Sequence, residues 1–421
     1  MGQYIINGGR KLSGEVFING SKNAALPILS AALINSGENI IHNCPDITDV
    51  SLTLEILKDL GCEISREGKT VIVNSKNAEY CGICQDTAGK MRSSILFMGV
   101  MLGKWGRSEI CRPGGCSIGR RPIDIHLDAM KELGAKIEEN DDSICCTAET
   151  LTGTSIYLPV ASVGATENIM LAAVFAKGRT VIHNAAREPE VVALQDYLKS
   201  IGVQVKGAGG QVIFIEGCSK FNDGEYSVIP DRIEAGTFMA AAAMTKGKIF
   251  LKNTNWLHMC KTVEIFSNCG CEIKAEKGGI YFKSPRKIKP ASVIRTGVYP
   301  NFPTDMQPIV MSMLTIAKGT SIIIETMFEN RFNHVSELNK MGAKITAQNR
   351  VAIVEGVRKL NGASVSATDL RAGAALIAAA LGAKGETVVQ NSHFVERGYE
   401  NIDGSLAALG ADIKFSPEIN V

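Results

Sequence analysis

The chain has few of the features of membrane proteins, of exported disulfide-rich proteins or of nucleic-acid-binding proteins. No apolar run reaches the roughly 18 residues that a bilayer span requires, so we expect no membrane-spanning helix. The first residues, Met1 to Gly8, lack the apolar region of a signal peptide, and we expect no export. The formal net charge is only +2, so bulk electrostatics do not favour a nucleic-acid partner.

The cysteines do not form a framework either. The 12 cysteines have no regular disulfide spacing, and in a chain without an export signal they indicate reduced thiols in the cytoplasm. Cys81 and Cys84 have the spacing of zinc ligands, but no second pair and no nearby histidine completes four ligands. We therefore expect neither a metal site nor a cofactor, and the sequence leaves the oligomeric state open.

Length and composition favour a turn-rich α/β protein of two domains. The chain has 421 residues, 45% of them hydrophobic, together with 42 glycines. A single core rarely grows to this size, so we expect two domains of about 200 residues each.

Two independent sets of glycines reveal an internal repeat. A helix-to-strand junction of the form apolar-Gly-x-x-apolar recurs six times, at Gly61, Gly134, Gly202, Gly270, Gly342 and Gly410. A second junction, usually Lys-Gly before a β-branched run, recurs at Gly37, Gly106, Gly178, Gly247, Gly319 and Gly385. Both sets have a period of about 70 residues, which predicts six copies of one structural unit.

Each copy is predicted to have the order β-α-β-α-β-β. The first helix is apolar nearly all round and should be buried; examples are 23–34, 162–176, 233–245 and 370–381. We expect it to end at the second-junction glycine, where a left-handed residue is wanted. An amphipathic helix ends at the first-junction glycine, and two short strands then form a hairpin, as in 62–65 and 70–73. Three copies can enclose three apolar helices within a ring of sheets, so two domains of three copies are expected, joined near 227–232.

Ionisable residues recur where the apolar helices begin. Counting back from the second-junction glycine, the same station holds Lys22, Arg92, Arg232, Asp305 and Arg371, and in the third copy Val163-Gly164. Helix N-termini with cationic side chains bind anions. We expect these residues to converge on one anion-binding cleft between the domains, although solvated helix-terminal charges are the simpler alternative.

One thiol has a setting unlike the others. Cys116 lies in the glycine- and arginine-rich stretch from Arg112 to Asp124, and a helix is predicted to follow at once. Nearby cations and a helix N-terminus lower a thiol's pKa, so this cysteine should be reactive. The alternative is a tight turn that carries an incidental cysteine.

Together these segments resemble the UDP-N-acetylglucosamine enolpyruvyl transferases over essentially the whole chain. The matching motifs are Ser21-Lys22-Asn23-Ala24-Ala25-Leu26-Pro27, the loop with Cys116 and Arg121-Pro122-Ile123-Asp124, Ser162-Val163-Gly164-Ala165-Thr166-Glu167, Phe302-Pro303-Thr304-Asp305-Met306-Gln307, Phe328-Glu329-Asn330-Arg331-Phe332, Asp369-Leu370-Arg371-Ala372 and Glu396-Arg397-Gly398-Tyr399-Glu400-Asn401. The resemblance implies two inside-out α/β barrels of three copies each. It also implies that residues 22–229 form one domain, that residues 1–21 join 230–421 in the other, and that the active site lies between them.

The resemblance further implies a reaction and the residues that perform it. Members of that family transfer the enolpyruvyl group of phosphoenolpyruvate to the 3-hydroxyl of UDP-N-acetylglucosamine, with release of phosphate, as the first committed step of peptidoglycan synthesis. Phosphoenolpyruvate would be held by Lys22, Asn23, Arg121, Arg331, Arg371 and Arg397. The nucleotide sugar would be lined by Asn23, Arg92, Arg121, Pro122, Ile123, Asp124, Ile125, Ser162, Val163, Gly164, Asp305 and Met327. Both partners are small molecules, and the doubled Arg120-Arg121 makes the assignment of Arg121 depend on the motif alone.

Two residues are expected to handle protons. Asp305 would act as general base towards the sugar hydroxyl, or at least orient it. Cys116 would protonate C3 of phosphoenolpyruvate. This role requires the protonated thiol, whereas the surrounding cations favour the thiolate.

Two other functions remain possible from the sequence. The shikimate-pathway enolpyruvyl transferase shares the six-copy fold but gives no reason for the cysteine loop. A non-catalytic scaffold or nucleotide-sugar sensor would be expected to have lost Cys116, Asp305 or an arginine.

Overall fold

The structure is a computed structural model that describes residues 2–83, 89, 91–111, 119 and 123–417. The chain divides into two compact units. The C-terminal unit contains the described residues of 1–19 and 230–421, and the N-terminal unit contains those of 20–111 and 123–229. Each unit has its own hydrophobic core. No helix among the residues described is long and apolar enough to cross a membrane.

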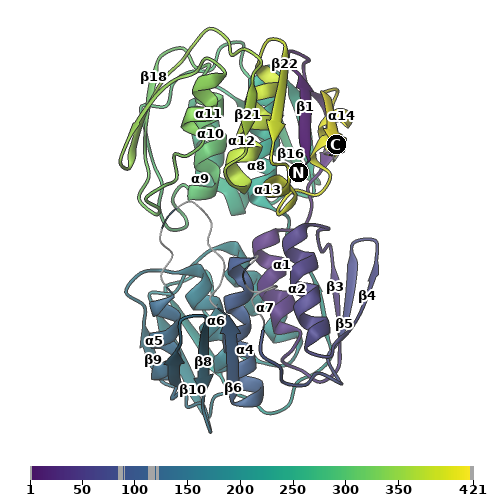
Figure 1. Ribbon diagram of the computed structural model, residues 1–421, viewed down its shortest axis with the longest axis vertical. Coiled ribbons are helices and arrows are strands. Elements are labelled where there is room, and N and C mark those ends of the chain that lie inside the picture. The colour runs from purple at the N-terminus through teal and green to yellow at the C-terminus, as the bar shows by residue number, and fades with distance from the viewer. Residues whose placement is uncertain (1, 84–88, 90, 112–118, 120–122, 418–421) are drawn as a thin grey trace. The chain divides into compact units, whose positions relative to one another are not determined.

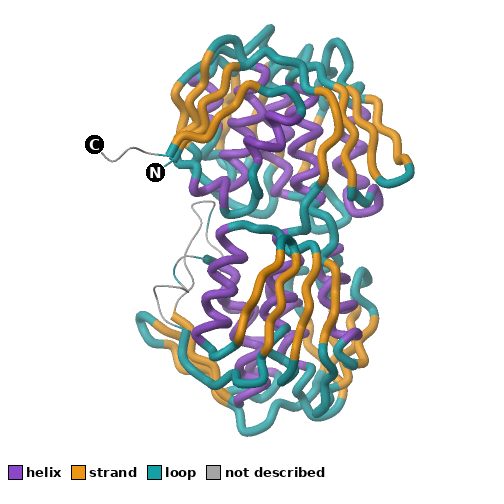
Figure 2. Tube along the Cα trace, turned by 90° about the vertical axis from the view of Figure 1, so that its right-hand side faces the viewer, coloured by secondary structure: helices purple, strands orange, loops and turns teal. Residues whose placement is uncertain are grey.

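The C-terminal unit has three four-stranded sheets around three apolar helices (Figures 1 and 2). The inner helices are α8 (Arg232–Met244), α10 (Gln307–Leu314) and α12 (Leu370–Gly382), and they pack on one another. The sheets have the orders β21(Ser364–Ser366)-β22(Glu386–Gln390)-β1(Gln3–Asn7)-β23(Asp412–Ser416), β15(Glu272–Glu276)-β16(Gly279–Lys283)-β14(Lys248–Lys252)-β2(Ser13–Phe17) and β17(Val293–Arg295)-β18(Thr320–Ile324)-β20(Val351–Glu355)-β19(Lys344–Gln348). The remaining helices are η2 (Trp256–Met259), α9 (Cys260–Asn268), η3 (Thr304–Met306), α11 (Val335–Lys340), α13 (His393–Glu396) and α14 (Ile402–Ala408).

The N-terminal unit repeats this arrangement. Its inner helices are α1 (Lys22–Ala31), α4 (Leu96–Trp105) and α6 (Val163–Ala173), and α4 packs against both of the others. The sheets have the orders β13(Gly224–Ser227)-β3(Glu38–His42)-β5(Thr70–Asn74)-β4(Glu63–Glu67), β11(Gln204–Lys206)-β12(Val212–Glu216)-β10(Arg179–His183)-β9(Ser155–Tyr157) and β6(Arg107–Cys111)-β8(Ser143–Thr147)-β7(Lys136–Glu139). The remaining helices are α2 (Thr48–Asp59), η1 (Arg92–Ile95), α5 (Asp124–Glu132) and α7 (Pro189–Ser200).

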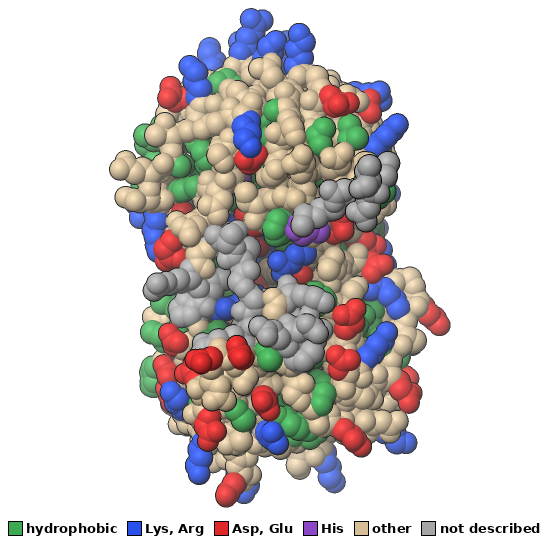
Figure 3. All heavy atoms as spheres, viewed as in Figure 1, with side chains coloured by type: hydrophobic (Ala, Val, Ile, Leu, Met, Phe, Trp, Pro, Cys, Tyr) green, Lys and Arg blue, Asp and Glu red, His purple; other side chains and the backbone are tan. Residues whose placement is uncertain are grey.

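The predicted inside-out α/β architecture with six repeats is confirmed, since each unit places its strands outside and its apolar helices inside (Figure 2). All twelve residues from Ile233 to Met244 are buried in α8, as expected of a helix that is apolar all round. Acidic and basic side chains are interspersed on the face of the N-terminal unit shown in Figure 3.

Strand pairing departs from a simple series of six contiguous copies. β13 pairs in parallel with β3 of the first copy, and β2 pairs in parallel with β14 of the fourth. β1 pairs with β22 and β23 of the sixth copy, where it takes the place of the second hairpin strand. The predicted β-α-β-α-β-β order holds along the chain in the first and fourth copies, whose first strands exchange sheets, and it is wrong for the sixth copy, where β1 supplies the missing hairpin strand.

The first-junction glycines end the amphipathic helices as predicted. Each of α2, α5, α7, α9, α11 and α14 stops two residues before its glycine, and all six glycines have φ between 86° and 103°. At the end of α2, the amide of Cys62 donates to the carbonyl of Leu57 and that of Gly61 to Lys58, which is a Schellman ending.

The second-junction glycines serve different purposes. Gly106 is the left-handed cap of α4, as expected. The prediction is wrong for α1, which ends at Ala31, well before Gly37, and for α8, where the left-handed residue is Lys246 rather than Gly247. At Gly37 a Cβ would lie 2.0 Å from a carboxylate oxygen of Asp223, so close approach is the constraint there.

Candidate active site

Four described residues of the predicted site lie at or just before the N-termini of buried helices. Lys22 is the first residue of α1, Arg92 begins the η1 turn that leads into α4, and Arg371 is the second residue of α12. Asp305 lies in η3, the turn before α10. The position identified from the sequence repeat therefore corresponds in these copies to the N-terminus of the buried helix.

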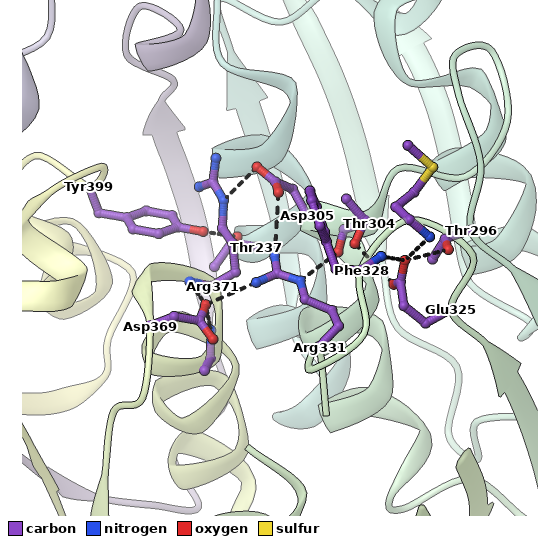
Figure 4. Close-up of polar contacts among 12 residues, drawn as sticks. Thr237, Thr296, Thr304, Asp305, Glu325, Phe328, Arg331, Asp369, Arg371 and Tyr399 are labelled. Carbon is purple, nitrogen blue, oxygen red and sulfur yellow. Dashed lines mark hydrogen bonds and ion pairs between the residues drawn. The ribbon is translucent and has the colours of Figure 1, made fainter. Parts of the chain in front are cut away.

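In the C-terminal unit, Asp305 is bound by two arginines (Figure 4). Its Oδ1 accepts from Nη2 of Arg331 at 3.3 Å, and its Oδ2 accepts from Nε of Arg371 at 3.1 Å. Both arginine side chains are nearly inaccessible, at 2% and 3% exposure, whereas Asp305 is 31% exposed. Two buried guanidinium groups therefore hold one partly exposed carboxylate, and they form a pre-built carboxylate site.

A second aspartate, Asp369, forms hydrogen bonds with both arginines. Asp369 is the N-cap of α12, and its Oδ1 accepts from the backbone amides of Arg371 and Ala372 at 2.9 and 3.1 Å. The same oxygen accepts from Nη1 of Arg331 at 3.1 Å. One side chain thus caps the N-terminus of α12 and orients an arginine.

Arg371 has a further donor directed away from Asp305. Its Nη1 is buried and has no hydrogen-bond partner among the described residues. The guanidinium lies 5.4 Å from the ring centre of Tyr399, whose hydroxyl is 2.8 Å from that of Thr237. Burial acts to lower the pKa of Arg371, but Tyr399 and Asp305 outweigh it and the pKa is raised. A charged donor that is buried without a partner is suited to an anionic ligand.

Met327 and Arg397 belong to the same unit. Met327 is 38% exposed, but its backbone N–H donates to Glu325, so only its side chain and carbonyl can face a ligand. Arg397 follows α13, which packs on α12, the helix of Arg371.

In the N-terminal unit, Lys22 has a buried acidic partner. Its Nζ lies 2.5 Å from Oδ2 of Asp49, a residue of α2 that is 2% exposed. Lys22 itself is 12% exposed, so this ion pair is largely shielded from water. Asn23 is the next residue of α1.

His126 organises the start of α6. Oδ1 of Asn168 accepts from the amide of Gly99 at 2.7 Å, which turns its Nδ2 towards Nδ1 of His126 at 3.0 Å. Nδ1 must then accept, and Nε2 carries the proton. Burial, with the charge of Arg92, lowers the pKa of His126 to about 4, so the ring is neutral.

The remaining predicted residues of this unit lie on two helix N-termini. Gly164 is close to the imidazole, because a Cβ there would be 3.3 Å from Cε1 of His126. Ser162 caps α6 and accepts from the amide of Ala165, and Val163 is the first helical residue. Ile123 caps α5, which then begins with Asp124 and Ile125.

Three predicted site residues lie outside the described residues, namely Cys116, Arg121 and Pro122. The same holds for Cys84 of the spaced cysteine pair. Among the residues described, no group of three or more His, Cys, Asp or Glu side chains could hold a metal ion.

Sequence reasoning missed several residues that now stand out. Asp369 had a signal, since an aspartate directly before an apolar helix is a typical N-cap. Asp49 had a weaker one, as an acid beside the apolar positions of an amphipathic helix. His126, Glu325 and Tyr399 had none, because their partners are distant in the sequence.

One pocket lies away from all of these residues. It has a volume of about 310 Å³ and lies between α9 and the edge strand β17, lined by Lys261, Asn268, Arg295 and Phe302 among others. None of the predicted site residues lines it, so we assign it no part in the chemistry.

Comparison with known proteins gives one consistent group. A family model described as EPSP synthase (3-phosphoshikimate 1-carboxyvinyltransferase) matches residues 6–406. UDP-N-acetylglucosamine 1-carboxyvinyltransferases 2 and 1 of Caldanaerobacter subterraneus subsp. tengcongensis are 46% and 48% identical, each over 98% of this chain and 99% of the relative. The enolpyruvyl transferase NikO from Streptomyces tendae superposes with a TM-score of 0.90 at 24% identity, with 99% of both chains covered. EPSP synthase from Acinetobacter baumannii gives 0.76 at 19% identity, over 99% of this chain and 100% of that one. At these identities the two structures show the shared fold alone.

Proposed function

Because the chain belongs to the UDP-N-acetylglucosamine 1-carboxyvinyltransferases, within the EPSP synthase family, we propose that it transfers an enolpyruvyl group to UDP-N-acetylglucosamine. The donor is phosphoenolpyruvate, the acceptor is the sugar's 3-hydroxyl, and phosphate is released. The 46% identity over 98% of the chain carries this conclusion. The reaction is the first committed step of peptidoglycan synthesis, and we place it in the cytoplasm.

The Asp305 cluster supplies the site for the carboxylate of phosphoenolpyruvate. Arg331 and Arg371 already hold a carboxylate in the chain itself, and their buried guanidinium groups can bind a substrate carboxylate in the same way. Such a ligand would compete with Asp305 for the two arginines. Binding of phosphoenolpyruvate would therefore release Asp305 from its ion pairs.

Released Asp305 is then available to the sugar hydroxyl. It accepts the hydroxyl proton, or orients the hydroxyl, as the oxygen attacks C2 of the donor. Cys116 gives a proton to C3 at the same stage. Net transfer of an enolpyruvyl group requires C3 to lose a proton again as phosphate leaves, which regenerates the double bond.

The anionic groups of both substrates require cations and helix N-termini. Lys22, Arg121 and Arg397 are assigned to the phosphate of phosphoenolpyruvate, and Asn23, the residue after Lys22, is assigned to the same donor. Beside the capping residue Ser162, the first turn of α6 offers the backbone amides of Val163 and Gly164 to the nucleotide diphosphate, with Arg92 adding positive charge. Arg121, Pro122, Ile123, Asp124, Ile125, Asp305 and Met327 complete the proposed nucleotide-sugar contacts. That both units contribute to one site stays a prediction.

The matching family model makes 3-phosphoshikimate the second candidate acceptor. One experiment separates the two acceptors. Phosphate release from phosphoenolpyruvate is measured with UDP-N-acetylglucosamine and, separately, with shikimate 3-phosphate. We expect release only with the nucleotide sugar, and release only with shikimate 3-phosphate would overturn the proposal.

A further inference from the structure

Glu325 is a buried acid that the proposed chemistry does not use. It follows strand β18 and is 1% exposed. Its Oε1 accepts from Oγ1 of Thr296 at 2.9 Å and from the backbone amides of Met327 and Phe328 at 2.8 and 3.3 Å. Its Oε2 accepts from Oγ1 of Thr304 at 2.9 Å. Figure 4 shows these four contacts converging on one carboxylate.

All four donors to Glu325 are neutral groups. Among the residues described, no lysine, arginine or histidine forms an ion pair with it. A buried carboxylate without a counter-cation is costly unless hydrogen bonds satisfy it, and here four of them do. Such a side chain orders its surroundings, because each donor is held in a fixed direction.

The contact with Thr304 leads directly to Asp305. The Thr304 hydroxyl donates to Glu325, while its carbonyl accepts from Nε of Arg331 at 3.4 Å. The threonine is thus held from two sides, and Asp305 is the next residue of the same short turn. On the other side, the bonds to Met327 and Phe328 bend the chain after β18 around the same carboxylate.

We infer that Glu325 is a positioning residue that acts through Asp305, by fixing the Thr304–Asp305 turn relative to Arg331. This inference rests on the proposed function only for the role of Asp305 in turnover. The position of the turn itself can be measured without any substrate.

The geometry of the two oxygens predicts which substitution is harmful. Backbone N–H groups cannot accept hydrogen bonds, so the Oε1 position must remain an acceptor, whereas the Thr304 hydroxyl can either donate or accept. Glu325→Gln can therefore keep all four contacts with its amide nitrogen towards Thr304. Glu325→Asp keeps the charge but is one methylene shorter, so it cannot reach both sides.

Turnover should depend on the length of the side chain at position 325 rather than on its charge. We expect Glu325→Gln to retain kcat within about threefold of the parent, and Glu325→Asp to lose about 30-fold or more, as misplacement by about 1 Å does. Substrate KM values should change much less than kcat. If Glu325→Asp turned over normally, or Glu325→Gln were the more damaging change, the inference would be wrong.

Thr304→Val tests the link to Asp305, with Thr296→Val as the matched control. Both changes remove one hydroxyl bond to Glu325, but only Thr304 adjoins Asp305. Thr296→Val also removes the acceptor of the Thr326 amide, so it is the more disruptive change locally and a stringent control. Thr304→Val should lower kcat about tenfold in the parent and less than twofold in an Asp305→Asn background, because the two residues then act as a unit. Thr296→Val should lower kcat less than threefold. Equal losses in the two backgrounds would show that Thr304 acts independently of Asp305.

Hydrogen exchange gives a readout that does not depend on activity. Amides of the peptide 302–308 should exchange faster in Glu325→Asp and Thr304→Val than in Glu325→Gln. Unchanged exchange in all variants would overturn the inference even if the enzyme were active. If the parent protein released no phosphate with any acceptor, the proposed function would fail, and the exchange rates would still decide the role of Glu325.

Discussion

Oδ2 of Asp305 accepts a hydrogen bond from Nε of Arg371 at 3.1 Å, and this contact joins a partly exposed carboxylate to a buried guanidinium group. The same carboxylate also binds Arg331. Both arginines are assigned to the carboxylate of phosphoenolpyruvate, so the chain's own acid occupies the place of the substrate's. Asp305 should therefore oppose donor binding while it supports turnover.

Asp305→Asn should separate these two effects. Turnover should fall about 10²-fold or more, because the positioned acceptor for the hydroxyl proton is lost. Affinity for phosphoenolpyruvate should rise several-fold, since the neutral amide competes weakly for the arginines. Calorimetric titration of the variant with phosphoenolpyruvate measures the second effect.

Inorganic phosphate is the control ligand for this variant because it carries no carboxylate. Its affinity should change less than that of phosphoenolpyruvate. An equal gain for both anions would indicate a general charge effect, and a weaker phosphoenolpyruvate complex would contradict the exchange of carboxylates.

Asp49→Asn should destabilise the N-terminal unit. Asp49 is 2% exposed and pairs with Lys22, so the variant removes the charge of one member of a shielded ion pair. We expect a loss of about 3 kcal/mol in the free energy of unfolding, measured with urea. Lys22→Met with Asp49→Asn should lose less than the sum of the two single changes. Additive losses would show that the pair is not coupled.

The features predicted from sequence are those with local causes. The glycine after α2, Gly61, could be assigned because ending a helix requires a left-handed residue, and six copies repeat that requirement. Arg371, the second residue of α12, was identified by counting back from the glycine of the second junction in the same copy. These signals depend only on neighbours along the chain.

The features that were missed depend on distant partners. Strand β1 pairs with β23, nearly the whole chain away, and neither segment carries a mark of the other. In the sequence, Glu325 follows a β-branched strand and cannot be told from an acid exposed to solvent. Only the fold brings Thr296 and Thr304 to it. The sequence therefore predicts the positions of the candidate site residues in each copy better than the contacts that hold those residues in place.

Cys116 should be the thiol that fosfomycin alkylates, as the family resemblance implies. Burial raises the pKa of five other thiols, to about 11 for Cys62 and Cys269, to about 12 for Cys146 and Cys271, and above its usual value for Cys218, so these should react slowly. Intact mass should rise by one inhibitor, faster with UDP-N-acetylglucosamine present, and peptide mapping should locate it at Cys116.

Exposed Cys260 provides the matched control for this labelling. Cys260→Ser should label normally and Cys116→Asp should not label, although it should keep activity because a carboxylic acid can still protonate C3. Cys116→Ser should be nearly inactive. Label found mainly at Cys260 or Cys81 would contradict this role of Cys116.

His126 should make the N-terminal unit sensitive to acid. Its pKa in the folded chain is about 4, below the ordinary 6.5, because burial and then Arg92 disfavour the charged ring. The unfolded chain therefore takes up a proton that the folded chain refuses, so stability is full above pH 6.5 and is lost as the pH falls towards 4. Between pH 7 and pH 5 this amounts to about 2 kcal/mol.

His126→Asn tests the size of that loss, because the asparagine oxygen can accept from Asn168 as Nδ1 does but does not titrate. The smaller side chain lowers stability at every pH by the same amount, so only the slope identifies the histidine. Urea unfolding at pH 7 and pH 5 should show that the parent loses about 2 kcal/mol more than the variant. Equal losses in the two proteins would mean that His126 takes up its proton without unfolding, and that its buried contact with Asn168 opens in acid.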